Sequence, residues 1–187
     1  MYPSYSAIQR ARGSFCYLFF GDGASACVVR MTSYDQKGIF ALGDHHSALI
    51  SDSSSDMVWT VGSTGFSLYL SPRIPELIGQ SVPIELERLI GQEVKPELWA
   101  IHPGGRGIID KLQVMYDLTD AQTRPSRTIL RDYGNMSSAT LLFVLQEMRQ
   151  GLQSRLEGHK DGIAIAFGPG LSMELMKISY IEGYSYA

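Results

Sequence analysis

The chain has 187 residues, of which 44% are hydrophobic and 19% are charged, a composition typical of a globular protein with one domain or two small ones. Its net charge of -3 excludes the basic surface that nucleic acids or anionic membranes attract. The two cysteines are too few for a disulfide framework and are typical of a reducing, cytoplasmic setting. Residues 139–145, the longest apolar run, are too few to span a bilayer, and residues 1–13 lack the apolar core of a signal peptide.

The sequence of residues 1–70 predicts a leader followed by strands. Residues 1–17 are polar and are expected to be a divergent, poorly ordered leader. After a glycine-rich turn, the β-branched run at 24–31 predicts a strand, and the apolar stretch at 38–50 predicts a second strand that pairs with it. Residues 51–56 have the composition of a loop, and the alternating pattern of 59–70 around two glycines predicts a hairpin.

The middle of the chain alternates between helix and strand patterns. Apolar residues recur at helical spacing over 72–90, where Pro83 is expected to divide the helix into two segments. Residues 98–102 predict a short buried strand that ends in a Pro-Gly-Gly turn. Residues 107–116 then have one apolar helical face, so a helix is expected there.

The last third predicts two helices and two strands. Residues 125–131 predict a helix with Pro125 in its first turn. Residues 136–156 predict the longest helix, whose apolar face would consist of Leu141, Leu142, Leu145, Met148 and Leu152. The continuous apolar run at 162–167 predicts a strand buried on both faces, and 172–180 is expected to pair back with it. The order of elements indicates an α/β layered fold with a mixed sheet.

Two polar residues stand where a strand or a helix begins or ends. His102 lies at the end of a buried strand, where it could act as an acid, a base or a hydrogen-bond donor; a satisfied core histidine is the alternative. Asn135 precedes an apolar helix, where it could cap the helix, donate to an oxyanion, or do both.

Several other motifs are weaker candidates. The Gly21–Ala26 segment matches a dinucleotide-binding pattern, but the residues after it are strand-like, so its glycines are predicted to let the backbone turn tightly beside a pocket. Cys16 and Cys27 lack the context of a reactive thiol and are predicted core residues. The Asp44-His45-His46 run is predicted to be a solvated turn and not a metal site, because adjacent strand residues point to opposite faces.

Four segments together resemble one family. They are FGDGASA at 20–26, WAIHPGG at 99–105, YGNMSSA at 133–139 and FGPGL at 167–171. In this order they resemble the chalcone/stilbene synthases, the type III polyketide synthases, over residues 18–178 and in a bacterial-like form. The resemblance implies a thiolase-like fold of two similar halves, each with a mixed sheet flanked by helices. Residues 18–50 would then hold the last strands of the N-terminal half, and 51–187 the C-terminal domain.

The resemblance also implies a site. The catalytic residues would be His102 and Asn135. The substrate cavity would be lined by Phe20, which matches an aromatic gatekeeper, and by Leu68, Ser137, Gly168, Pro169 and Gly170. Gly105 and Gly107 would contact coenzyme A. Leu68 is smaller than an aromatic residue, so we expect room for a long or bulky acyl chain.

The implied activity is that of a polyketide acyltransferase, the decarboxylative condensation of malonyl-CoA onto an acyl-CoA starter. A protonated His102 beside a cysteine would favour the thiolate that carries the acyl group. His102 and Asn135 would both donate to the enolate oxygen formed by decarboxylation. Acyl-CoA and malonyl-CoA are the expected substrates, with no cofactor and no metal. A homodimer is expected of the full-length family, with no nucleic-acid or membrane partner.

The chain departs from the family in one large respect. The family's nucleophilic cysteine, and most of the basic residues that bind coenzyme A, belong to an upstream segment that does not occur in this sequence. We therefore expect a fragment or truncated product that is inactive without a cysteine-bearing half. Three alternatives stay open. The first is an enzyme like ketoacyl carrier-protein synthase III, although the His-Gln-Ala-Asn and Gly-Asn-Thr-Ser motifs of that enzyme differ from those here. The second is a non-catalytic partner half-subunit, and the third is a papain-like hydrolase that uses Cys16 or Cys27.

Overall fold

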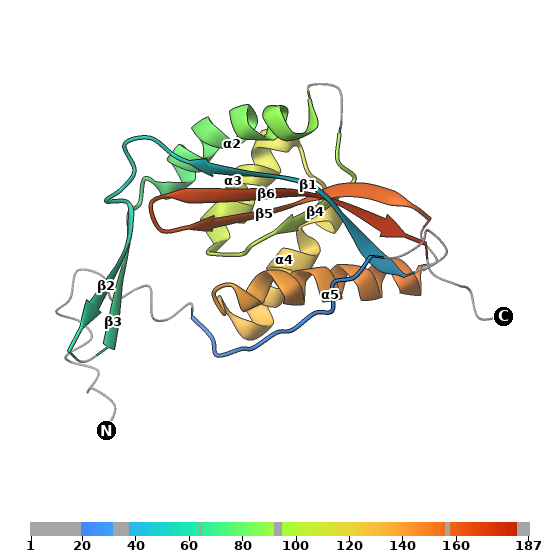
Figure 1. Cartoon of the computed structure of the whole chain (residues 1–187), viewed down its shortest axis with the longest axis horizontal. Coiled ribbons are helices and arrows are strands. Elements are labelled where there is room, and N and C mark those ends of the chain that lie inside the picture. The colour runs from blue at the N-terminus through green and yellow to red at the C-terminus, as the bar shows by residue number, and fades with distance from the viewer. Residues whose placement is uncertain (1–19, 32–37, 64, 92–94, 156–157, 183–187) are drawn as a thin grey trace.

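The computed structural model describes residues 20–31, 38–63, 65–91, 95–155 and 158–182. Its centre is a four-stranded mixed sheet with helices on both faces (Figure 1). The strands follow one another across the sheet in the order β1 (Ile39–Leu49), β6 (Ser172–Ile181), β5 (Lys160–Gly168) and β4 (Leu98–Ile101). β6 pairs antiparallel with both of its neighbours, and β4 pairs parallel with β5.

The buried strands follow from their sequences. β5 is apolar at consecutive positions because both of its faces are covered. Ile163 and Ile165 belong to the core on one face, and Ala164 belongs to the core on the other. Residues 98–102 and 162–167 were each predicted to form a strand, and β4 and β5 lie side by side in this sheet, since Ala100 pairs with Ala164. Within the described residues β4 is an edge strand.

Four helices within the described residues complete the layers. They are α2 (Ile74–Ile90), α3 (Arg106–Tyr116), α4 (Asp120–Tyr133) and α5 (Ala139–Ser154). α2 and α3 bury their apolar residues on one face of the sheet, and α5 buries its own on the opposite face. α4 lies beside β4, in contact with both α3 and α5. No helix within the described residues is long and apolar enough to cross a bilayer.

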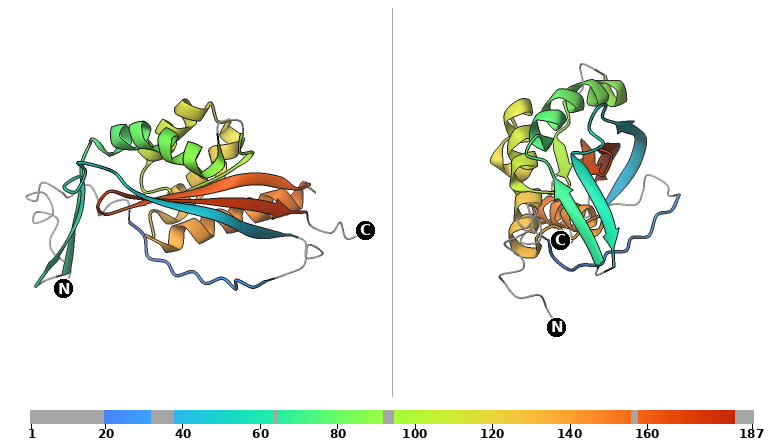
Figure 2. Two further views of the ribbon diagram at one scale, coloured as in Figure 1. Left: turned by 45° about the horizontal axis from the view of Figure 1, so that its top comes forward. Right: turned by 90° about the vertical axis from the view of Figure 1, so that its left-hand side faces the viewer.

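A separate hairpin extends from one end of the sheet (Figure 2). It consists of β2 (Met57–Gly62) and β3 (Gly65–Leu70), as the sequence predicted. At its base, the Ser71 N–H donates to the Asp56 carbonyl oxygen over 2.7 Å. The Arg73 guanidinium lies 3.7 Å from the buried carboxylate of Asp56.

The first predicted strand is not formed. Residues 21–31 belong to no strand, and β1 pairs with β6 instead. A strand needs a partner along its edge; β6 supplies that partner to β1, and no described strand supplies one to residues 24–31. Cys27 is exposed, which corrects its prediction as a core residue. Cys16 and the predicted leader at 1–17 lie outside the described residues.

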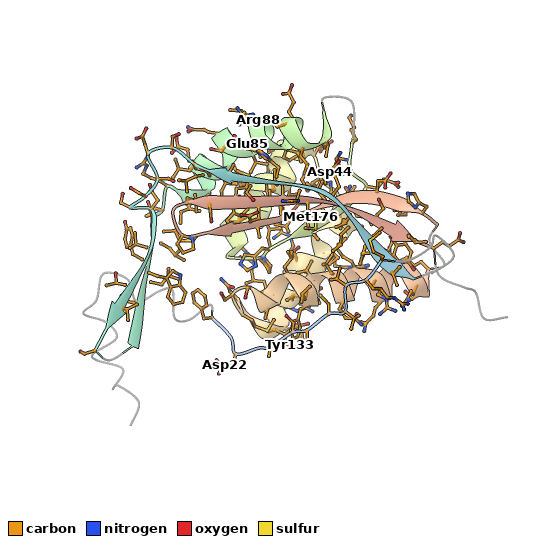
Figure 3. The ribbon with its side chains drawn as sticks, in the orientation of Figure 1. Asp22, Asp44, Glu85, Arg88, Tyr133 and Met176 are labelled. Atoms are coloured by element: carbon orange, nitrogen blue, oxygen red, sulfur yellow. The ribbon has the colours of Figure 1, made fainter. Side chains whose placement is uncertain are left out.

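The Asp44-His45-His46 run lies within β1 and not in a turn. Its side chains have separate partners. Asp44 pairs with Lys177 at 2.9 Å, and His46 pairs with Glu85 of α2 at 2.7 Å. Arg88 also pairs with Glu85, so this cluster joins β1 to α2 (Figure 3).

Three predicted helix boundaries were wrong. α2 is continuous over 17 residues through Pro83, because its buried apolar face outweighs one missing hydrogen bond. α4 begins at Asp120 and not at Pro125, because Thr119 and Gln122 form a capping box. α5 begins at Ala139, and its buried residues are Thr140, Val144, Met148 and Leu152. Leu141, Leu142 and Leu145 are only half-buried.

Candidate functional site

His102 continues the line of β4 into a cavity. Its backbone N–H donates to Ile165 of β5 over 2.8 Å, so the residue is held in the sheet although the strand ends at Ile101. The hydroxyl of Ser126 donates to the Ile101 carbonyl oxygen over 2.7 Å and ties α4 to the same point. The His102 side chain is 8% exposed, so a rigid buried strand end presents the imidazole.

The turn after His102 lies against the imidazole ring. A Cβ atom at Gly104 would stand 3.1 Å from the Ile108 side chain and 3.6 Å from Cδ2 of His102. Glycine therefore lets the turn approach both groups. The Gly104 N–H donates back to the His102 carbonyl oxygen over 2.9 Å, which closes the turn beside the ring.

Asn135 is held in one orientation by two hydrogen bonds. Its Oδ1 accepts from the backbone N–H of Ser137 at 2.9 Å, and its Nδ2 donates to the Gly104 carbonyl oxygen at 3.3 Å. The carboxamide N–H₂ group therefore faces the turn that follows His102. The helix-cap interpretation was wrong: Asn135 forms a local turn, and the N-cap position of α5 belongs to Ser138.

A second set of contacts supports this turn. Thr140 Oγ1 accepts from the Met136 N–H and donates to the Ser137 carbonyl oxygen, both over 2.8 Å. Ser137 itself has a φ of 58°. This left-handed backbone conformation is not helical, so α5 begins only after Ser137. The interruption leaves Asn135 outside the helix and directed at the cavity.

Phe20 is brought to the site through Asn135. The two residues form a parallel β-bridge, and the Gly21 N–H donates to the Asn135 carbonyl oxygen over 3.0 Å. A Cβ atom at Gly21 would overlap the carbonyl oxygen of Tyr133, and one at Gly23 would overlap the side chain of Met136. These glycines therefore permit close packing against the Asn135 loop, where the sequence predicted a tight turn.

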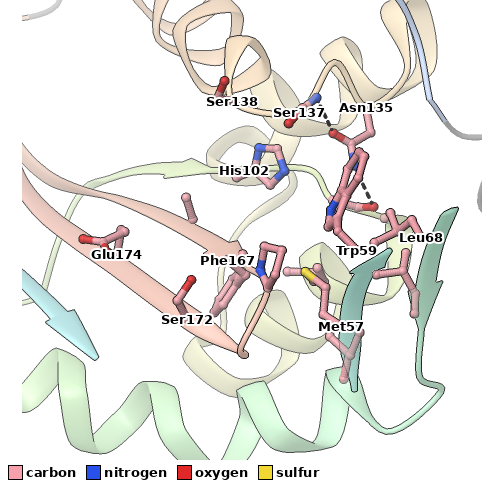
Figure 4. Close-up of a pocket in the computed structure, with 18 of the residues that line it drawn as sticks. Met57, Trp59, Leu68, His102, Asn135, Ser137, Ser138, Phe167, Ser172 and Glu174 are labelled. Atoms are coloured by element: carbon pink, nitrogen blue, oxygen red, sulfur yellow. Dashed lines mark hydrogen bonds between the residues drawn. The ribbon is translucent and has the colours of Figure 1, made fainter. Parts of the chain in front are cut away.

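These residues surround one cavity of about 510 Å³ (Figure 4). The predicted site residues that line it are Phe20, Leu68, His102, Gly105, Gly107, Asn135, Ser137, Gly168 and Pro169. Gly170 is not among the lining residues; its carbonyl oxygen accepts from the Ser53 hydroxyl at 3.3 Å. The structure thus brings all but one of the predicted residues together, whereas their roles stay predictions.

Sequence reasoning missed several lining residues. Trp59 stands directly opposite Leu68 in the hairpin, and both border the cavity. The indole therefore occupies part of the room that was expected beside Leu68. Among the described residues that line the cavity, Glu174 is the only charged one. Its Oε2 accepts from the Ser47 hydroxyl of β1 at 2.5 Å. The alternation of the hairpin could have revealed Trp59, but no sequence signal pointed to Glu174.

Burial sets the charge of the imidazole. Desolvation lowers the pKa of His102 from 6.5 to about 4, so the ring is neutral at pH 7, with one N–H donor and one acceptor nitrogen. The protonated His102 that the sequence-based mechanism assumed is therefore absent from this chain alone. The neutral ring and the Asn135 amide can still donate hydrogen bonds to an oxygen that gains negative charge in the cavity.

No described cysteine borders this cavity. Cys27 lies in a separate groove beside α5, and Cys16 is outside the described residues. Within the described part of the chain there is also no cluster of three or more residues that could hold a metal ion. The described residues thus provide hydrogen-bond donors and apolar walls to the cavity, without a thiol.

Comparison with known proteins finds a family model and solved structures that match this chain. The family described as chalcone and stilbene synthases, C-terminal domain, matches residues 45–182. The crystal structure of PKS-I from the brown alga Ectocarpus siliculosus is similar over 78% of this chain, at 27% sequence identity and a TM-score of 0.69. That match covers 41% of the algal chain, so this chain spans less than half the length of the relative.

Proposed function

Because this chain belongs to the chalcone and stilbene synthase family, transferases with a thiolase-like fold, we propose that it forms the histidine and asparagine side of a decarboxylating condensation site. The observation that carries the proposal is the convergence of the His102 imidazole and the Asn135 carboxamide on one cavity. Both groups are held by rigid elements, and the surrounding wall is mostly apolar, which strengthens hydrogen bonds to a developing charge.

The first step assigned to these residues is decarboxylation of a malonyl thioester. The bond between the α-carbon and the carboxylate breaks, and CO₂ leaves. The electron pair of that bond forms an enolate, whose oxygen carries the charge. His102 and Asn135 each donate one N–H to that oxygen, so no proton transfer from either residue is needed. The neutral state of His102, which follows from its burial, is sufficient for this role.

The second step is condensation with an acyl thioester. The enolate carbon attacks the thioester carbonyl, a carbon–carbon bond forms, and the carbon–sulfur bond breaks to release a thiolate. This step requires a cysteine that carries the acyl group. Cys27 is exposed and borders a different groove, which argues against a papain-like pair with His102. We therefore propose that the acyl-carrying cysteine comes from a segment beyond these 187 residues.

Malonyl-CoA turnover by the purified chain tests the first step. We expect slow formation of acetyl-CoA, detected by mass spectrometry, and no polyketide pyrones when an acyl-CoA is added. Asn135→Ala or His102→Ala should each lower the acetyl-CoA rate by about 100-fold or more, which is the usual effect of removing one oxyanion donor. His159→Ala is the matched control, because its imidazole is exposed and pairs with Asp161 outside the cavity.

Two results would contradict the proposal. Equal acetyl-CoA rates for the wild-type chain and the Asn135 and His102 variants would show that these groups do not stabilise the enolate. Pyrone formation that disappears on Cys27→Ala would show instead that this chain supplies its own nucleophile.

A further inference from the structure

The charged residue Glu174 lies on the side of the cavity away from the hairpin (Figure 4). The hairpin side is apolar, with Met57 and Leu68 in the wall. On the opposite side, β6 contributes Glu174 and the half-buried Ser172 to the lining. The two sides of the cavity therefore differ in polarity, and the proposed decarboxylation makes no use of a carboxylate.

The register of the sheet aligns Glu174 with His102. The His102 N–H donates to the Ile165 carbonyl oxygen of β5, so the next residue of β5, Ala166, lies beside His102. Ala166 pairs in turn with Glu174 of β6, and Glu174 pairs with Ser47 of β1. Residues that lie opposite each other on neighbouring strands direct their side chains to the same face of the sheet. The row of side chains on the face that α5 covers therefore consists of His102, Ala166, Glu174 and Ser47.

Small residues leave space along this row. Only the methyl group of Ala166 lies between His102 and Glu174. Beside it, Gly168 pairs with Ser172, and a Cβ atom at Gly168 would stand 2.9 Å from the Ser172 hydroxyl oxygen. Neighbouring strands lie about 4.8 Å apart, so the two strand spacings from His102 to Glu174 amount to roughly 10 Å. An acyl chain can therefore lie across β5 between the imidazole and the carboxylate.

The Glu174 carboxylate can accept further hydrogen bonds. Its Oε2 accepts from the Ser47 hydroxyl at 2.5 Å, and among the described residues Ser47 is its only hydrogen-bond partner. A carboxylate accepts up to about four hydrogen bonds, and Glu174 is exposed, so a ligand in the cavity can reach it. In a mostly apolar cavity a hydroxyl group is the favoured donor. It costs less to remove from water than an ammonium group, whereas a second carboxylate would be repelled.

We propose that Glu174 determines acyl specificity, because its carboxylate accepts a hydrogen bond from a hydroxyl group of an acyl thioester whose carbonyl oxygen lies at His102 and Asn135. The inference rests on the proposed function and names the substrate class of the same site, which is hydroxylated acyl groups. Ser47 holds the carboxylate in place. A hydrogen bond to a charged acceptor is stronger than one between neutral groups, so the site favours a chain that ends in a hydroxyl over a chain whose oxygen cannot donate.

Binding of two matched thioesters tests the inference. The N-acetylcysteamine thioesters of 6-hydroxyhexanoic and 6-methoxyhexanoic acid have the same acyl chain, but only the first can donate a hydrogen bond. Their dissociation constants with the purified 187-residue chain are measured by NMR titration. We expect the hydroxyl compound to bind about 10-fold more tightly, the usual effect of a hydrogen bond to a charged group. Glu174→Met, which removes the acceptor, should abolish this preference, and Glu174→Gln, which keeps one neutral acceptor, should reduce it.

The matched control is Glu97→Met, which removes a carboxylate that pairs with Lys160 outside the cavity. It should retain the full preference. The ratio of the two dissociation constants separates specificity from stability, because a loosened cavity would weaken the binding of both thioesters equally.

Four results would overturn the inference. They are equal binding of the two thioesters by the wild type, an unchanged preference in Glu174→Met, no binding of either thioester, and tighter binding of the 6-aminohexanoyl thioester, which would assign Glu174 to a cation. No decarboxylation occurs in this measurement, so it can fail while the malonyl-CoA assay supports the proposed function, and the reverse also holds.

Discussion

Acidification should destabilise this protein through His102, because folding holds the imidazole in a dry site where its charged form is disfavoured. Burial lowers the pKa of His102 from 6.5 to about 4. Between these two pH values the unfolded chain binds a proton that the folded chain does not, so the free energy of unfolding falls as pH falls. The His102 contribution is complete above pH 6.5 and lost by about pH 4. At about 1.4 kcal/mol for each pH unit, the loss is about 3 kcal/mol.

Urea unfolding at a series of pH values from 7 to 4 measures this loss. The wild-type chain is compared with His102→Gln, which keeps a polar side chain of similar size but does not titrate. Carboxylates titrate in both proteins, so the difference between the two curves isolates the imidazole. We expect the free energy of unfolding of the wild type to fall by about 3 kcal/mol more than that of the variant. His159→Gln, whose side chain is exposed, should retain the wild-type pH dependence. Parallel curves for wild type and His102→Gln would refute the argument that burial controls this group.

Three further predictions concern packing. Gly21→Ala places a Cβ atom against the Tyr133 carbonyl oxygen, so the hydrogen bond from the residue 21 amide to Asn135 should weaken. Hydrogen exchange of this amide should therefore be faster in the variant than in the wild type, and unchanged protection would contradict this prediction. Gly151→Ala is the opposite case, because nothing lies within 4 Å of the Cβ atom that it adds in α5. Alanine has a higher helix propensity than glycine, so this change should raise the free energy of unfolding, measured by thermal or urea melts, by up to about 1 kcal/mol. The chain alone should associate and bind a hydrophobic dye, because Val28 and Val29 are exposed beside a groove whose lining includes Leu142 and Phe143 of α5. A monomer by light scattering that does not bind the dye would show that this surface is stable in water.

The central strands could be predicted from sequence because their signals are local. The segment that ends in His102 and the 162–167 segment are short apolar runs bounded by turn residues, and they lie side by side in the sheet. The hairpin likewise followed from alternation between two glycines. In the two central strands the residues that define the element also provide its buried surface, so the pattern and the packing agree.

The strand predicted at 24–31 is not formed, because no described strand lies beside these residues to pair with them. Its composition favours a strand, but β-propensity reflects packing against neighbours that these residues lack here. Helix starts failed for a different reason. The start of α4 depends on the Thr119 capping box, and the start of α5 depends on the left-handed conformation of Ser137. Pro125 suggested the start of the first of these helices and an apolar face suggested the second, and neither signal contains information about the capping box or about Ser137.

The site was only partly visible in the sequence. Motifs identified His102 and Asn135, and the structure brings them to one cavity. Trp59 was missed because its place in the wall depends on the register that sets it opposite Leu68. Glu174 was missed because it lies in β6 among residues without any motif. Lining residues of this kind come from elements that converge only in the folded protein, so spacing along the chain does not reveal them.

The pKa of His102 provides a test of the proposed function, which requires a cysteine from a segment beyond these 187 residues. In the chain alone, desolvation lowers this pKa to about 4, which opposes the imidazolium that would stabilise a thiolate. A thiolate beside the ring would act in the opposite direction, because a nearby negative charge favours the protonated imidazole. Binding of the cysteine-bearing part should therefore raise the pKa of His102 by one pH unit or more, measured by NMR titration of its ring protons. The same partner with its cysteine changed to serine should bind equally well and leave the pKa near its value in the free chain. If both partners bind and neither moves this pKa, the cysteine does not reach His102, and the acyl group cannot be carried at this site.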